Sequence, residues 1–125
     1  MLPACNQQTF VEFEGARDYP LAATQAETLN VQVFRKGTNI QLTNTSSTSL
    51  EAGTLWLNQW WFREVPALLP GASLRLPLKQ FVDKYGDPFR AGGFFATRDP
   101  DILVLAQWQT EGQLLGLIVV ENQIN

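Results

Sequence analysis

Short segments in which apolar and polar residues alternate recur along most of the chain. Leu29, Val31 and Val33 are separated by other side chains, and a similar alternation follows over residues 39–43. Successive side chains of a strand point to opposite faces, so this period of two predicts a pair of strands with one apolar face each. Gly37 lies between the two segments and supplies the positive φ that a tight hairpin turn needs.

More strands are predicted in the rest of the chain. Their ranges are 10–14, 55–57, 60–65, 73–78, 102–108 and 114–120. Asn58-Gln59 and Glu111-Gly112 have the composition of tight hairpin turns, and Pro77 favours an edge or an end for the strand that contains it. The last two segments are apolar on both faces, which is typical of central strands that are covered on both sides.

Two segments depart from this alternation. Residues 79–85 have a helix-like spacing, and residues 16–28 are polar and rich in small residues, which favours a surface arm. We therefore expect an all-β fold, an immunoglobulin-like antiparallel β-sandwich with one short helical turn near 79–85. Residues 1–15 would form a tether and first strand, and residues 16–125 a single sandwich domain that includes the arm.

The composition mainly excludes functions. The chain has 125 residues, no histidine, one cysteine and a formal net charge of −3. Without histidine it lacks the commonest general base and metal ligand, and a single cysteine excludes an internal disulfide and a multi-cysteine zinc site. The charges are scattered singly, so no basic stripe is available for nucleic acid. We expect a protein without enzymatic activity, catalytic residues, metal or cofactor.

Two local patterns resemble immunoglobulin-like and fibronectin type III-like modules of bacterial envelope proteins. The first is a strand that ends in an Asn-Thr-Ser turn, at residues 40–46. The second is a Leu-Pro-Gly segment that leads into an alternating strand, at residues 68–76. The resemblance extends over residues 29–120 and implies a fold, not an activity. The paired cysteines of antibody domains are missing, and Trp56 is expected in a core position similar to that of their tryptophan.

The start of the chain resembles a bacterial lipobox. Leu2-Pro3-Ala4-Cys5 places an apolar, a variable and a small residue before the only cysteine, and a polar segment, residues 6–8, follows it. The resemblance implies that Cys5 is lipidated and anchors the protein on the outer side of a bacterial membrane, in the periplasm or cell envelope. A basic and apolar signal peptide is then expected upstream of Met1. An ordinary thiol in a frayed terminus is the alternative.

Two polar patterns have simple structural interpretations. Four aspartates, at positions 83, 87, 99 and 101, accompany prolines and glycines, so we interpret them as turn formers and caps rather than as a catalytic pair or a calcium site. Asn44-Thr45-Ser46 matches the acceptor sequence for N-glycosylation, which we interpret as incidental in a bacterial protein.

The consecutive aromatic residues Trp60, Trp61 and Phe62 are the strongest candidate for a binding site. In a strand their side chains alternate between two faces, so we expect at least one ring at the surface unless the strand is buried on both sides. Exposed tryptophans often anchor protein partners, and we expect these three residues to bind a partner in a membrane-associated assembly. The chain would then be an accessory or structural subunit. The alternative is a carbohydrate-binding module that uses the same rings, for which Asn58 and Gln59 are the only polar neighbours in sequence that would not compete with the stacking of Arg63 on an outer ring.

Overall fold

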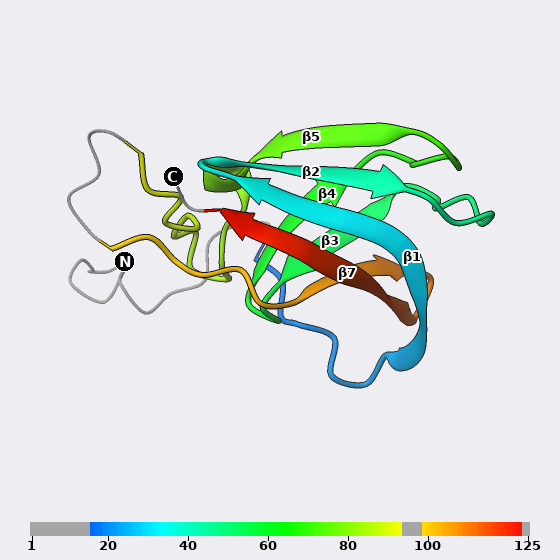
Figure 1. The fold of residues 1–125 in the computed structure, drawn as a ribbon. Helices are drawn as coiled ribbons and strands as arrows, with labels where there is room; N and C mark the ends of the chain where they lie inside the picture. The colour runs from blue at the N-terminus through cyan, green and yellow to red at the C-terminus, as the bar shows by residue number, and fades with distance from the viewer. Residues whose placement is uncertain (1–15, 94–98, 124–125) are drawn as a thin grey trace.

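The computed structural model describes residues 16–93 and 99–123, and it confirms an all-β fold (Figure 1). One mixed sheet curls into a half-barrel, with the strand order β4-β3-β6-β7-β1-β2-β5. The strands are β1 (Thr24–Lys36), β2 (Asn39–Asn44), β3 (Gly53–Leu57), β4 (Trp61–Val65), β5 (Ser73–Pro77), β6 (Ala106–Thr110) and β7 (Gln113–Gln123). A short 3-10 helix, η2 (Leu78–Gln80), follows β5.

The three predicted hairpins are all present. β1 pairs with β2, β3 with β4, and β6 with β7, each in the antiparallel sense. The turn between β3 and β4 holds Asn58 and Gln59 at φ angles of 55° and 59°. Two consecutive residues in the left-handed region are what a two-residue hairpin turn requires, and asparagine tolerates this region better than most residues.

The centre of the sheet is a parallel pair that the local alternation did not predict. β1 runs beside β7 with Val33 opposite Val119, and their arrows point the same way in Figure 1. All other neighbouring strands are antiparallel. β6 and β7 are central strands as predicted, but the outer face of β7 is only partly covered, since Ile118 is 39% and Val120 50% exposed.

Strand β6 begins later than the predicted range 102–108. The side chain of Asn58 takes up backbone groups of the preceding segment: its Oδ1 accepts hydrogen bonds from the amides of Val104 and Leu105, at 2.8 and 3.0 Å, and its Nδ2 donates to the carbonyl of Ile102 at 2.7 Å. One amide side chain thus replaces part of a neighbouring strand. Residues 102–105 therefore remain outside the ladder.

Two other predicted boundaries shift. The arm predicted at 16–28 is shortened to residues 16–23, because β1 already pairs with β7 from Thr24 onward. The helical turn expected near 79–85 is limited to η2, because Val82 exchanges two backbone hydrogen bonds with Phe62 and is held extended. The predicted first strand, at 10–14, and Cys5 lie outside the described residues.

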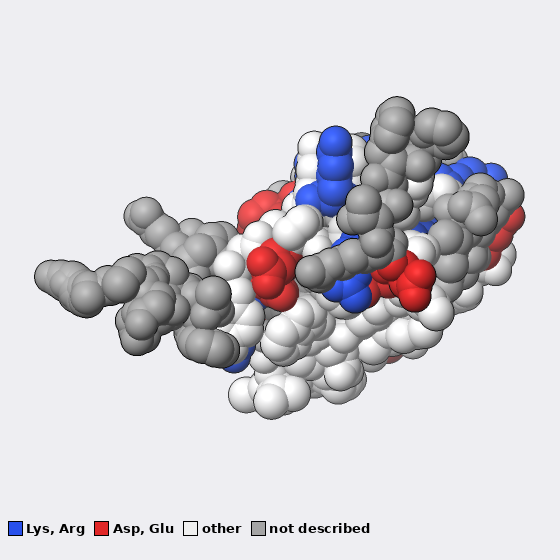
Figure 2. All heavy atoms as spheres, turned by 90° about the vertical axis from the view of Figure 1, so that its left-hand side faces the viewer, with Lys and Arg blue, Asp and Glu red and all other residues white. Residues whose placement is uncertain are grey.

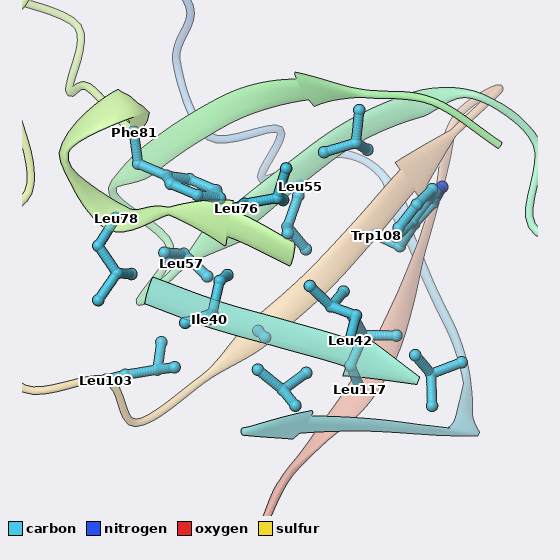
Figure 3. Packing of buried hydrophobic residues seen from close by; sticks show 14 of the residues in the cluster. Ile40, Leu42, Leu55, Leu57, Leu76, Leu78, Phe81, Leu103, Trp108 and Leu117 are labelled. Carbon is cyan, nitrogen blue, oxygen red and sulfur yellow. The ribbon is translucent and has the colours of Figure 1, made fainter. Parts of the chain in front are cut away.

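The core fills the concave side of the curled sheet. Ile40 and Leu42 from β2 face Leu55 and Leu57 from β3, and all four side chains are fully buried (Figure 3). Leu76 from β5 and Trp108 from β6 join the same cluster. The alternation along each strand therefore delivers one apolar side chain per two residues to a common interior.

A second, smaller cluster lies on the outer face of β3, β4 and β7. Trp56, Phe62 and Leu114 are buried there, and Tyr19 from the arm packs against them. The ring of Tyr19 meets that of Trp56 edge-on, at 5.5 Å between centroids. Trp56 is thus buried as expected, but beneath the arm and outside the main core. The arm consequently becomes a fixed part of the outer surface.

Candidate functional site

The three consecutive aromatic residues are placed in three different environments. Phe62 is buried against Trp56, with ring centroids 5.2 Å apart. Trp61 points to the opposite face and packs edge-on against Phe89 at 4.9 Å. Trp60 precedes β4, in the turn, and 42% of its surface is exposed. Of the three rings, Trp60 is therefore the one with a large area open to a ligand.

Trp60 lines a hollow with a volume of about 510 Å³. This volume is within the range of about 300–1,000 Å³ that is common for small-ligand sites. The hollow is walled on one side by the arm, through Arg17, Asp18, Tyr19 and Leu21. Its other lining residues are Gln59, from the turn between β3 and β4, and Lys84. Three segments that are distant in sequence thus meet around one indole ring.

The arm is fixed in this position by specific contacts. The guanidinium of Arg17 donates to Thr54 Oγ1, forms an ion pair with Glu64 at 2.9 Å and lies 5.8 Å from the centroid of the Phe62 ring. The hydroxyl of Tyr19 donates to Oε1 of Gln107 at 2.7 Å. These bonds tie the arm to β3, β4 and β6, so its wall of the hollow is present before any ligand arrives.

The carboxylate of Asp83 holds the ring of Trp60 in place. This carboxylate is only 6% exposed, and its Oδ2 accepts a hydrogen bond from the indole Nε1 of Trp60 at 3.2 Å. Its Oδ1 accepts from the amides of Tyr85 and Asp87, at 2.9 and 3.0 Å. A carboxylate that caps two amides holds a tight turn. The same residue thereby sets the position of Tyr85, whose ring centroid is 6.4 Å from that of Trp60.

The charges that surround the hollow are paired with one another. Besides the pair between Arg17 and Glu64, Lys84 Nζ lies 3.5 Å from Asp18 Oδ1. Each pair is partly exposed, with a side-chain exposure of 43% and 63% in the first and 30% and 72% in the second. Such pairs contribute little to stability, about 0–1 kcal/mol each. Each pair brings opposite charges together, so neither pair adds a net charge beside the hollow.

Acidic and basic side chains are also mixed elsewhere on the surface. In Figure 2 lysines and arginines are interspersed with aspartates and glutamates, and the lower part of that view shows few charged atoms. Among residues 16–93 and 99–123, no three histidine, cysteine or acidic side chains come together as a group that could hold a metal ion. No helix within those ranges is both long and apolar enough to cross a membrane.

The predicted turn-forming role of the aspartates is seen at position 83, whereas Asp101 joins two segments of the chain. Asp101 Oδ2 accepts a hydrogen bond from the amide of Arg90 at 2.7 Å, and its Oδ1 lies 3.4 Å from the Arg90 guanidinium. Asp87 and Asp99 are exposed. The four residues do not form a joint site in the structure, since Asp83 holds the turn at residues 83–87 and Asp101 bonds to Arg90.

The glycosylation-like sequence is structural. Asn44 is fully buried, and its Nδ2 donates to the carbonyls of Thr48 and Leu68 at 2.8 and 3.0 Å. Its Oδ1 accepts from the amide and the hydroxyl of Ser46. An amide nitrogen that makes two buried bonds is not accessible to a glycosyl carrier in the folded protein. The side chain instead closes the loop after β2.

The sequence alone did not identify four residues next to Trp60. Arg17, Asp18, Lys84 and Tyr85 come from segments more distant in sequence than Asn58 and Gln59, and only the fold brings them to the ring. Gln59 does line the hollow as its position suggested, while Asn58 is occupied by residues 102–105. No family model, curated protein or solved structure matches the chain, so the hollow is interpreted from its own chemistry.

Proposed function

We propose that the protein is a non-catalytic binding module of the bacterial cell envelope, which recognises its ligand at the hollow beside Trp60. The observation that carries this proposal is a half-exposed indole ring, held in place by Asp83, in a hollow with preformed walls. Rigid aromatic anchors in concave sites bind with little loss of conformational entropy. The binding role expected of all three aromatic residues is thus assigned to Trp60, since Phe62 packs against Trp56 and Trp61 against Phe89.

Anchoring through Cys5 is part of the same proposal. A lipid on this residue would hold the module on the outer side of the membrane, as an accessory or structural subunit of a membrane-associated assembly. Its support is the lipobox-like sequence that precedes the only cysteine. We further propose that the curled sheet is an immunoglobulin-like sandwich. It is supported by the way β2 and β5 face β3 and β4 across one core, as two sheets of a sandwich do (Figure 3).

Metabolic labelling tests the lipid anchor. Cells that express the protein with its native upstream sequence are grown with an alkyne-tagged fatty acid, and the purified protein is examined by mass spectrometry. We expect label on the wild-type protein and none on Cys5→Ser, since no second cysteine is present in the chain. A wild-type protein isolated from its native membrane with an intact Met1 and a free Cys5 thiol would contradict the anchor.

Binding to isolated envelopes tests the hollow. The soluble Cys5→Ser protein is mixed with envelope fractions from the native cells, and the bound fraction is measured by sedimentation. A second substitution in the same protein, Trp60→Ala, should weaken this binding about tenfold or more, as expected for a dominant aromatic anchor. The matched control is Leu69→Ala, which removes another exposed apolar side chain, 60% exposed, that does not line the hollow. Equal binding by Trp60→Ala and the control protein would disprove recognition at this site.

A further inference from the structure

From the chemistry of the hollow we infer the class of its ligand: a neutral sugar ring, of the kind that a glycan presents, which stacks on Trp60 and is hydrogen-bonded by the paired charges around it. This inference rests on the proposed binding role of the hollow. It names a ligand that the sequence favoured less, because the polar residues nearby in sequence were few. The fold supplies the missing ones from the arm and from the turn after Val82.

Trp60 and Tyr85 together form an aromatic surface. Trp60 is 42% and Tyr85 37% exposed, and their ring centroids lie 6.4 Å apart with an angle of 52° between the ring planes. The face of an aromatic ring is electronegative and attracts weakly polarised C–H bonds, which line one face of a sugar ring. Asp83 holds both partners of this surface, the indole through Nε1 and Tyr85 through its amide. The platform is therefore ordered before a sugar binds.

The charged side chains beside the hollow are paired with opposite charges. Arg17, Lys84 and Asp18 line the hollow, and each of the two cations has an anion within 3.5 Å, since Lys84 is paired with Asp18 and Arg17 with Glu64, which lies outside the lining. A charged ligand would gain from one member of a pair and be repelled by the other. A sugar hydroxyl is both a donor and an acceptor, so it can bond to a carboxylate or to a cationic group without breaking an ion pair.

A neutral polar side chain, that of Gln59, lies next to Trp60 in the hollow. Gln59 is exposed, lines the hollow and precedes Trp60 directly, so its amide offers a donor and an acceptor at the edge of the indole. The hydroxyl of Tyr19 lies 3.4 Å from Gln59 Nε2 and links this amide to the arm. A protein side chain that entered the same hollow would instead have to cover these polar groups without replacing their hydrogen bonds to water.

An array of neutral, acidic and amino-group-bearing oligosaccharides tests the inference with the Cys5→Ser protein. We expect neutral members to bind. Isothermal titration calorimetry with the best neutral oligosaccharide should then show an affinity at least about tenfold weaker for Trp60→Ala and a smaller loss for Tyr85→Ala. Trp60→Phe keeps a ring and should retain part of the affinity. Leu69→Ala should bind as the parent protein does. Affinity for the neutral ligand should also change little between low and high salt.

Several outcomes would overturn the inference, and they are distinguishable from failure of the binding role itself. A silent array, combined with envelope binding that depends on Trp60 and disappears after protease treatment of the envelopes, would assign the hollow to a protein partner. Binding only of charged oligosaccharides, with strong salt dependence, would contradict the neutral class. Neutral binding that is unaffected in Trp60→Ala and Tyr85→Ala would place the sugar elsewhere. Envelope binding that is independent of Trp60 would instead remove the proposed function.

Discussion

Replacing Arg35 with alanine is expected to lower the free energy of unfolding by about 3–5 kcal/mol. This side chain is fully buried in β1, yet it is positively charged. Its guanidinium donates to the carbonyls of Gly37, Ala91 and Asp101, and lies 5.3 Å from the centroid of the Phe89 ring. Burial lowers the pKa of Arg35, which the Asp101 carboxylate partly opposes, but arginine remains protonated at neutral pH. The substitution would leave three carbonyls without their donor.

Urea denaturation at neutral pH, followed by circular dichroism, measures this loss. Arg75→Ala is the matched control, because Arg75 is an exposed arginine on the edge strand β5. Exposed substitutions of this kind usually change stability by no more than about 0.5 kcal/mol. Similar unfolding midpoints for the two variants would show that the three carbonyls find other partners. A total stability of about 5–15 kcal/mol is usual for a domain, so the expected loss for Arg35→Ala is a large share.

Trp108→Ala should be about as severe, with a loss of about 3–5 kcal/mol. Trp108 is fully buried in the main cluster, and its indole Nε1 donates to the carbonyl of Glu51 at 2.9 Å. Truncation creates a cavity next to Leu55, which is its partner across β3 and β6, and removes that hydrogen bond. The loss is measured from the thermal or urea midpoint of the purified variant.

Trp60→Ala is the control, because it makes the same substitution at a partly exposed tryptophan. In the wild-type protein Trp60 is 42% exposed, and its indole donates a hydrogen bond to Asp83. We expect a loss of about 1 kcal/mol, which leaves the protein folded for the binding experiments. If Trp60→Ala were as unstable as Trp108→Ala, the ring would be a structural element and its effect on binding would have to be judged from Trp60→Phe.

The sequence predicted those parts of the fold that depend on neighbouring residues. Alternation over 29–43 and the turn residues Gly37 and Asn58-Gln59 act within a few positions, so hairpins could be identified directly. The curl of the sheet and the parallel pairing of β1 with β7 depend on contacts between distant segments. An apolar pattern does not specify which distant strand it will face, and this explains why those features were not predicted.

The same distinction applies to the site. The aromatic sequence at 60–62 pointed to the turn that borders the hollow, but the division of the three rings between the hollow, the main core and the outer cluster depends on the surrounding elements. Asn58 illustrates the difference: its left-handed backbone was predictable, whereas its side-chain bonds to residues 102–105 were not. Those bonds lie just before β6, which begins later than the apolar pattern predicted.

The position of β7 between β6 and β1 has a consequence for how the chain folds. Until β7 is in place, the sheet consists of two pieces, β4-β3-β6 and β1-β2-β5, with no ladder between them (Figure 1). During synthesis β6 and β1 would each present an open edge for as long as β7 has not emerged from the ribosome. Open edges invite pairing with other chains, and closing a sheet between distant segments is slow. Newly made protein is therefore most exposed to aggregation, and most dependent on chaperones, in the interval before this strand inserts.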